Sequence, residues 1–366
     1  MPNFRSGQVA EILSERPGLQ RLRIAMDDGQ LDRAYCLTEL IGQVAVGDHV
    51  VCNTTAVDLG LGTGGWHVVH WNHAQRSVTK PGPDHVMKLR YTSLQFDAGT
   101  SELVHQDLGE HLNARPVIAI QVHSQLGIVA PVIAALRPGT KVAYVMTDGA
   151  SLPLALSDLV ANLREADLLC GTVTSGHSFG GDLEAVSVPS GLLLAAEVLE
   201  AEIIVAGMGP GVVGTGTRYG NSAVEAAWIL NCVATLGGEP VMCIRASNGD
   251  ARGRHAGMSH HSSTALGLCP VEPWVATGPF APTAGVRSID VEVPPVERIL
   301  QESGIPVTTM GRTYAQDTAF FESAAAAAAA AVHLLTHQSP TTPSVSPHRA
   351  PLARSTPAQD LESDTQ

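Results

Sequence analysis

From Pro116 onward the chain alternates between short, almost continuously apolar segments and longer segments with helical spacing. An apolar strand of this kind is buried on both faces, as happens when helices cover both sides of a parallel sheet. The pattern therefore predicts a mostly parallel, three-layer α/β domain over residues 116–335. The predicted strands are 116–122, 141–147, 168–174, 202–208, 240–246, 289–293 and 306–310. The predicted helices are 126–136, 152–165, 183–200, 221–236, 295–303 and the Ala-rich run 324–331.

The first part of the chain has a different pattern, which predicts short strands separated by tight turns. Strands are predicted at 7–15, 19–28, 32–37, 49–57 and 66–71, with a hairpin turn at Asp28-Gly29. Five strands at this spacing predict a small antiparallel β-barrel of the SH3 or OB type over residues 1–75. Residues 76–115 form a connector that contains one strand-like piece, and the Pro/Ser/Thr-rich residues 336–366 are predicted to be disordered.

Composition limits the class of function. The net charge of −13 argues against binding to nucleic-acid backbones, which requires a basic face. No uncharged apolar run of about 18 residues or more and no signal-peptide pattern is found, so no membrane association is expected. The six cysteines include no CxxC pair, which favours reduced thiols and a cytoplasmic location. A small anionic molecule is the expected partner, and a homo-oligomer is possible.

A glycine-rich segment follows the predicted strand 202–208 and leads into a helix. Backbone N–H groups at such a turn can bind an anion. The segment lacks the Lys-Ser/Thr ending of a Walker-type phosphate loop and only approaches the dinucleotide fingerprint. Tight packing of helix and strand is the alternative explanation of the glycines. The residues predicted to contact an anion are Gly209, Gly211, Gly214, Thr215, Gly216 and Thr217.

Two further loops carry candidate catalytic groups. Asp148 follows one predicted strand, and His177 lies among glycines after the next. Asp182 follows in the same loop, where acids often serve only a helix dipole. Ligands of parallel α/β sheets bind beyond the carboxyl ends of the strands, where these loops would meet. We therefore expect His177 to act as a general acid or base, oriented by Asp148 or Asp182.

The segment 246–266 combines arginines and histidines in an unusual density. Arg252 and Arg254 are predicted to clamp a phosphate or carboxylate, with His255 as a second candidate for proton transfer. The alternative is a divalent metal, the one cofactor the sequence suggests. Its possible ligands are His177, Asp182, His255, His260 and His261. Because neighbouring arginines repel a cation, the anion clamp is the preferred interpretation.

Several strings in this chain resemble those of a bacterial protein family known only as a domain of unknown function. They are NTTAVDLGLGTGGWHVV, HVMKLRYTSLQ, MTDGASLPLALSDLV, TSGHSFGGDLEAV, GMGPGVVGTGTRYG and RHAGMSHHSSTAL, in this order within residues 5–320. The resemblance implies no activity, substrate or cofactor. The residues themselves predict an enzyme that transfers or hydrolyses a group on a small phosphorylated or otherwise anionic metabolite. A metal-dependent hydrolase and a non-catalytic ligand-binding or regulatory protein are the alternatives.

Overall fold

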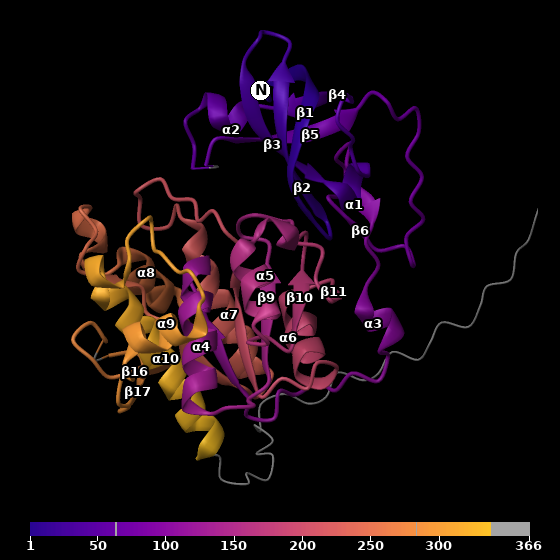
Figure 1. The fold of residues 1–366 in the computed structure, drawn as a ribbon. Helices are drawn as coiled ribbons and strands as arrows, with labels where there is room; N and C mark the ends of the chain where they lie inside the picture. The colour runs from indigo at the N-terminus through magenta and orange to yellow at the C-terminus, as the bar shows by residue number, and fades with distance from the viewer. Residues whose placement is uncertain (63, 283, 338–366) are drawn as a thin grey trace, which may run out of the picture.

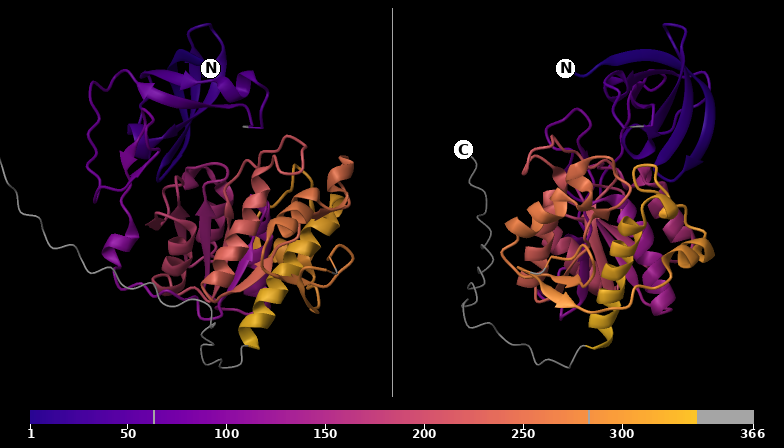
Figure 2. Two further views of the ribbon diagram at one scale, coloured as in Figure 1. Left: turned by 180° about the vertical axis from the view of Figure 1, so that it is seen from behind. Right: turned by 90° about the vertical axis from the view of Figure 1, so that its left-hand side faces the viewer.

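The computed structural model describes residues 1–62, 64–282 and 284–337, and it consists of a β-barrel joined to a larger α/β domain (Figures 1 and 2). The part of the predicted disordered tail from residue 338 on lies outside the described residues. The barrel sits above one edge of the α/β domain in both figures. Arg16 of the barrel donates to the Ala155 carbonyl and pairs with Asp158, and both of these residues belong to the α/β domain.

The barrel contains the predicted five strands and is closed. They are β1 (Phe4–Arg16), β2 (Leu19–Met26), β3 (Leu31–Leu37), β4 (His49–Asn53) and β5 (Trp66–Asn72). The strand order is β1-β2-β3-β5-β4, and closure comes from a parallel pairing of β3 with β5, while the other pairs are antiparallel. Helices α1 (Thr38–Ile41) and α2 (Thr55–Asp58) are single turns, so the strand predicted at 49–57 ends at Asn53.

The connector makes a two-stranded ribbon and a short helix before it enters the main sheet. The elements are β6 (Met87–Lys88), β7 (Phe96–Asp97) and α3 (Ser101–Val104). Lys88 is buried against the α/β domain, where its ammonium group contacts Glu184 Oε2 at 2.5 Å and donates to the Thr174 carbonyl at 3.1 Å. This contact attaches the connector to the larger domain.

The α/β domain is built on an eight-stranded sheet whose neighbouring strands are all parallel. In spatial order these are β11 (Leu183–Ala185), β10 (Gly171–Ser175), β9 (Val142–Thr147), β12 (Ile203–Met208), β8 (Pro116–Ala119), β13 (Glu239–Met242), β16 (Trp274–Ala276) and β17 (Arg287–Ile289). A separate small ribbon pairs β14 (Ala246–Ser247) with β15 (Gly257–Met258). The predicted parallel sheet is confirmed.

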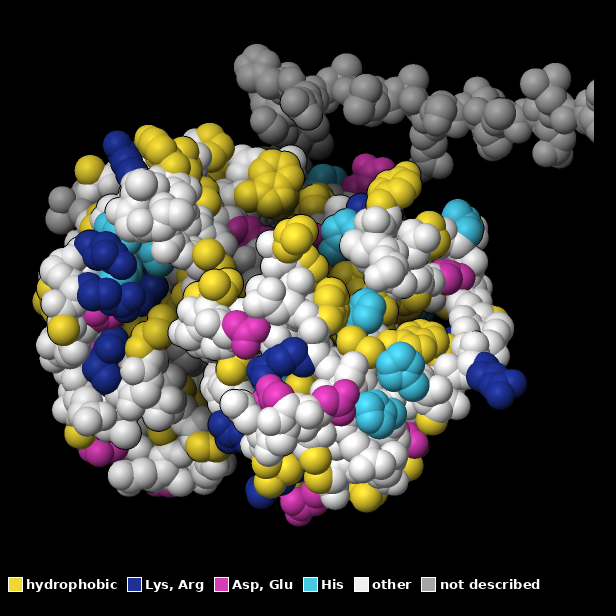
Figure 3. Space-filling model, turned by 90° about the horizontal axis from the view of Figure 1, so that it is seen from above, with side chains coloured by type: hydrophobic (Ala, Val, Ile, Leu, Met, Phe, Trp, Pro, Cys, Tyr) yellow, Lys and Arg dark blue, Asp and Glu magenta, His cyan; other side chains and the backbone are white. Residues whose placement is uncertain are grey.

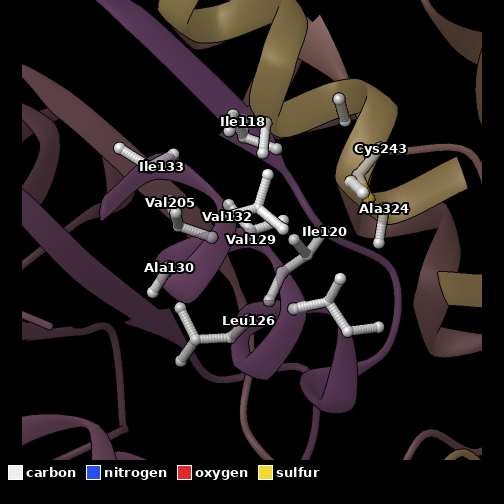
Figure 4. Packing of buried hydrophobic residues seen from close by; sticks show 14 of the residues in the cluster. Ile118, Ile120, Leu126, Val129, Ala130, Val132, Ile133, Val205, Cys243 and Ala324 are labelled. Carbon is white, nitrogen blue, oxygen red and sulfur yellow. The ribbon is translucent and has the colours of Figure 1, made fainter. Parts of the chain in front are cut away.

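Helices cover both faces of this sheet, as predicted. One face packs α4 (Leu126–Leu136), α5 (Asp158–Glu165), α9 (Val296–Ser303) and α10 (Thr318–Thr336); the other packs α6 (Val188–Glu197), α7 (Glu225–Thr235) and α8 (His260–Leu268). Strand β9 shows why both faces of the sheet are apolar. Tyr144 belongs to the first core and its neighbour Val145 to the second, because alternate side chains point to opposite faces. Figure 4 shows the first core around Leu126 and Ala324.

Besides the bounds of individual elements, the main sheet differs from the prediction in three segments. Leu183–Ala185, predicted as the start of a helix, forms the edge strand β11 beside β10. The strand predicted at 306–310 is reduced to a single bridge between Thr309 and Arg312. Strand β16 was not predicted, because its apolar run is only three residues long. Each difference concerns a segment too short for periodicity to distinguish strand, helix and loop.

Helix α10 has the length and hydropathy of a membrane-spanning helix. Most of it is buried against α4 and the sheet, as in the core helix of a soluble protein. Alanine predominates in this helix because its small side chain lets α10 lie close to the neighbouring strands.

Candidate functional site

Five loops leave the sheet at the carboxyl ends of β8, β9, β10, β12 and β13. Because all strands are parallel, these loops lie along one edge, as expected for a binding site of this architecture. The spatial order, however, separates β10 from β13 by four strand spacings. At about 4.8 Å each, this is roughly 19 Å. His177, which follows β10, and Arg254, which follows β13, therefore lie on the same edge at different places.

Asp148 and His177 are neighbours, but Asp148 bonds to the backbone of His177 and not to its imidazole ring. Asp148 Oδ2 accepts a hydrogen bond from His177 N at 3.0 Å, whereas His177 Nδ1 accepts one from Leu89 N at 3.1 Å. A Cβ atom at Gly176 would collide with the Asp148 carboxylate, and its φ of +66° also favours glycine. Asp148 thus positions the loop rather than the imidazole ring.

Asp182 lies elsewhere and has other partners. Its carboxylate pairs with Arg164 at 2.6 Å and accepts hydrogen bonds from the backbone N and Oγ1 of Thr172 at 2.8 and 2.9 Å. Thr172 is three residues before the end of β10, so Asp182 is about 10 Å from the carboxyl edge. The structure gives this predicted catalytic acid the role of anchoring β11 beside β10.

The glycine segment forms a hairpin instead of an open cradle of N–H groups. We call Gly214–Asn221 the glycine hairpin, since these two residues form a bridge and Thr215 N donates to the Gly220 carbonyl at 2.8 Å. The hydroxyl groups of Thr215 and Thr217, predicted to contact an anion, bond to each other at 2.9 Å. These hydroxyl groups therefore form hydrogen bonds inside the hairpin instead of pointing to a free anion site.

The structure gives different physical reasons for glycine at the positions of this segment. A Cβ atom at Gly209 would lie 2.9 Å from the Ser151 carbonyl oxygen, so the close approach of two backbones requires glycine there. Gly211 and Gly216 have φ values of +103° and +85°, which other residues rarely adopt. Gly214 has neither constraint, and its missing side chain leaves His261 Nε2 uncovered.

Three histidines of the segment 246–266 form a compact cluster. The ring centroids of His260 and His261 are 4.4 Å apart, and each lies 5.0 Å from that of His255. One nitrogen from each ring lies within 4.8 Å of the others. Ser259 organises the group: it caps α8 by accepting from His261 N at 3.2 Å, and its Oγ lies 2.7 Å from His255 Nδ1.

Arg245, which the sequence analysis did not select, determines the tautomer of His261. It is 3% exposed, and its Nη1 lies 3.0 Å from His261 Nδ1. A guanidinium group can only donate, so His261 Nδ1 accepts and a neutral His261 carries its proton on Nε2. The sequence offered no signal for this, because Arg245 stands in an apolar strand pattern.

Burial and the nearby arginines keep the histidines neutral. Burial, followed by the charge of Arg245, lowers the pKa of His261 to about 3. Burial, with Arg245 and Arg252, lowers the pKa of His255 to about 4. Both rings are therefore uncharged at neutral pH and can accept a proton or bind a ligand as neutral donors.

These shifts predict how stability depends on pH. An unfolded histidine gains a proton below about pH 6.5 whereas folded His261 does not, so the folded state loses stability as pH falls from 6.5. Burial raises the pKa of Glu225 to about 7, which acts in the opposite direction over this range. We therefore compare the wild type with His261→Gln by urea unfolding between pH 7 and 5. Between pH 7 and 5 the change in unfolding free energy should be about 2 kcal/mol less favourable in the wild type than in the variant, and equal changes would contradict the assignment.

The two predicted clamp arginines have different surroundings. Arg252 forms a two-point contact with Asp250, with Nε–Oδ1 and Nη2–Oδ2 distances of 2.9 and 2.7 Å. Within the described residues, Arg254 has no acidic partner at ion-pair distance, and it approaches Gly216 of the glycine hairpin. Arg252 therefore stabilises its own loop, and Arg254 is the arginine left available to a ligand.

A hollow of about 390 Å³ lies between the glycine hairpin and helix α8. We call it the Arg–His hollow; its lining residues are Gly216, Arg218, Arg254, His260, Ser263 and Thr264. None of these is acidic, whereas two are arginines. Seen from above, the molecule shows Lys or Arg side chains gathered around histidines on one side (Figure 3). The hollow combines positive charge, hydroxyl groups and an imidazole.

A second group of polar side chains on this edge, in which Ser157 and Tyr144 are buried and His123 is half-buried, also escaped sequence analysis. His123 Nε2 lies 2.7 Å from Ser157 Oγ, and its Nδ1 lies 3.2 Å from the Tyr144 hydroxyl. Burial lowers the pKa of His123 to about 4. Since Ser157 also caps helix α5 by accepting from Val160 N, this group has a structural explanation.

The model of one protein family, described as Protein of unknown function (DUF3866), matches residues 33–328. No curated protein and no solved structure matches the chain. The match spans the barrel from β3 onward, the connector and almost all of the α/β domain. It includes every predicted site residue.

Proposed function

Since this chain belongs to the DUF3866 family, whose function is unknown, we propose its function from its own site: it binds a small phosphorylated or otherwise anionic metabolite in the Arg–His hollow. The observation that carries this proposal is a lining with two guanidinium groups and no carboxylate among the described residues. Guanidinium groups bind phosphate and carboxylate through paired N–H donors, which accounts for the preference. Ser263 and Thr264 of α8 add hydroxyl groups to the lining; that of Ser263 donates to the Ser259 carbonyl at 3.4 Å.

The proposed activity is transfer or hydrolysis of a group on this metabolite, with an imidazole moving the proton. His260 is the best placed, because it lines the hollow and belongs to the histidine cluster. The ring of His255, which does not line the hollow, lies against that of His260. Neutral imidazoles act as general bases, and a bound anion would raise their pKa toward neutrality. His177 lies too far along the edge for the same centre. We also propose a cytoplasmic location, in keeping with the free cysteines.

The test is binding of inorganic phosphate and simple phosphomonoesters, measured by thermal unfolding and calorimetry. A ligand at one hundred times its dissociation constant stabilises the folded protein by about 2.7 kcal/mol. Arg254→Gln should weaken binding at least about tenfold, because a hydrogen bond to a charged group contributes about 1.5–3 kcal/mol. Arg298→Gln is the control, since Arg298 is exposed on α9 and, among the residues that the structure describes, pairs only with Glu302. Equal affinity in both variants would refute the site, and a lack of stabilisation by any anion would refute the function.

The second candidate is a metal-dependent hydrolase, and the compact histidine cluster is the observation that favours it. Three neutral imidazoles are suitable ligands for zinc. However, the proton on His261 Nε2 and the nearby arginines oppose a cation there. His177 and Asp182 are too distant to complete this ligand set. Elemental analysis of protein purified without chelators distinguishes the two, because a stoichiometric metal would favour this candidate over the anion site.

A non-catalytic ligand-binding or regulatory role is the remaining alternative. It would retain the hollow but need no proton transfer. Once a substrate is known, His260→Ala distinguishes an enzyme from a non-catalytic binding protein. Loss of turnover with retained binding of the substrate supports an enzyme. Binding without turnover of any phosphorylated compound tested would support a regulatory protein.

A further inference from the structure

The Arg–His hollow is lined by two arginines whose charges are not neutralised nearby. Arg218 and Arg254 both line the hollow, and both side chains are exposed to solvent. Among the residues that the structure describes, neither guanidinium group forms an ion pair or donates a hydrogen bond, and Arg218 only lies over the Tyr219 ring, 5.2 Å from its centroid. A guanidinium group carries five N–H donors. Two sets of donors are therefore accessible to a ligand in this hollow.

The glycine hairpin lies along helix α8. At its first residue, a Cβ atom at Gly214 would lie 3.7 Å from the Nε2 atom of His261, in the first turn of the helix. Farther along the hairpin, Arg218 Nη2 lies 3.5 Å from the position of a Cβ atom at Gly267, in the last turn of the helix. His261 and Gly267 are six residues apart, which is about 9 Å along a helix axis. Arg218 thus places its guanidinium group at one end of α8.

Arg254 lies toward the other end of this helix. It directly precedes His255, whose ring centroid is 5.0 Å from that of His260, the first residue of α8. Burial, followed by the charge of Arg254, lowers the pKa of His260. Arg254 Nη1 also lies 3.7 Å from the position of a Cβ atom at Gly216. The guanidinium groups of Arg254 and Arg218 therefore occupy different parts of one hollow.

The size of the hollow and the chemistry of its donors limit what can fill it. Its volume of about 390 Å³ lies within the range of about 300–1,000 Å³ that small-molecule sites span, so it has room for more than a single ion. A phosphoryl group has three acceptor oxygens and up to about two negative charges, which use the donors of a guanidinium group more fully than a carboxylate does. One phosphoryl group beside Arg254 would leave Arg218 unneutralised.

We propose that the ligand carries two phosphoryl groups, one bound by Arg254 and the other by Arg218. This inference rests on the proposed anion site, and it adds the number and the arrangement of the charged groups of the ligand. The positions of the two arginines favour a bisphosphate, in which a short carbon chain separates the phosphoryl groups, over a diphosphate, in which they are adjacent.

The experiment compares ligands with one and with two phosphoryl groups. Calorimetry at one ionic strength measures the affinity of the full chain for methyl phosphate, diphosphate, propane-1,3-diyl bisphosphate and fructose 1,6-bisphosphate. We expect at least one bisphosphate to bind about tenfold or more tightly than methyl phosphate, a difference of about 1.4 kcal/mol. Tightest binding of diphosphate would support two phosphoryl groups and place them next to each other.

Two variants test the position of the second phosphoryl group. Arg218→Gln removes the guanidinium group, and Gly267→Asp puts a carboxylate beside it, since a Cβ atom at Gly267 lies 3.5 Å from Arg218 Nη2. Both positions are exposed, so the fold should persist. Each variant should reduce the preference for the bisphosphate over methyl phosphate to less than about threefold.

Matched control variants make the same chemical changes away from the hollow. Gly278→Asp adds a carboxylate at an exposed glycine where a Cβ atom meets nothing within 4 Å. Arg298→Gln removes an exposed arginine of α9. Neither residue lines the hollow, so both variants should keep the preference for the bisphosphate.

The outcomes separate this inference from the proposed function. If methyl phosphate binds as tightly as every ligand with two phosphoryl groups, and Arg254→Gln weakens them all, the anion site stands and the second phosphoryl position is wrong. That position is also wrong if Arg218→Gln and Gly267→Asp keep the preference, because the greater charge of the ligand would then explain it. If no phosphate compound binds, the proposed function itself fails.

Discussion

Replacing Asp317 with alanine is expected to lower the free energy of unfolding by about 3–5 kcal/mol, the usual cost of removing one partner from a buried ion pair. Asp317 is fully buried. Its carboxylate accepts hydrogen bonds from Arg312 Nε at 2.9 Å, Ser247 Oγ at 2.7 Å and Asn248 N at 3.0 Å. Arg312 also approaches Asp250, which in turn holds Arg252. Asp317 therefore anchors the loop that carries Arg254 and His255.

Chemical denaturation of the variant measures this loss. Asp290→Ala is the control, because Asp290 is exposed and accepts a hydrogen bond from Thr277 Oγ1, its one side-chain partner in the described part of the chain. We also expect Asp317→Ala to weaken phosphate binding under conditions where the protein is still folded, since the position of Arg254 depends on this loop. A destabilisation below about 1 kcal/mol would mean that the buried network contributes little to the fold.

Replacing Lys88 with methionine is expected to have a similarly large effect, about 3–5 kcal/mol. Lys88 is 1% exposed, and its ammonium group contacts Glu184 and donates to the carbonyl oxygens of Thr174 and Ser178. Methionine preserves much of the volume but leaves the Glu184 carboxylate without its cation. Because Lys88 attaches the connector to the α/β domain, the variant should also expose this junction to proteolysis.

A double variant separates the charge from the packing. Lys88→Met combined with Glu184→Gln removes both charges, and it should recover more than half of the stability lost in Lys88→Met. Lys80→Met, at an exposed position of the same connector, should change stability by less than about 0.5 kcal/mol. If the double variant were no more stable than Lys88→Met, an unpaired buried carboxylate would not explain the loss.

Much of the fold follows directly from the residue pattern. Near-continuous apolar runs such as 142–147, separated by helical periods, predicted a parallel sheet with helices on both faces, and this is what forms. The Asp28-Gly29 turn and the short alternating strands predicted the barrel. Prediction failed at Leu183–Ala185, because an edge strand of three residues depends on its neighbour β10 more than on its own sequence.

The candidate site was only partly predictable. The sequence indicated the importance of Arg254, His255 and His260, because arginines and histidines are rarely so dense without a reason. It could not show that Arg252 pairs with Asp250. Nor did it indicate Arg245, since this residue stands in an apolar run.

The sequence alone determined which segments are strands and helices, which faces are apolar, and that the polar loops share one edge of the sheet. These properties depend on local periodicity and on the burial of apolar side chains. Only the tertiary structure decided which loops are neighbours, because the order β10-β9-β12-β8-β13 differs from the order along the chain. That order separates His177 from Arg254 and brings the glycine hairpin beside α8. Long-range packing of the strands is therefore the physical reason why the site forms where it does.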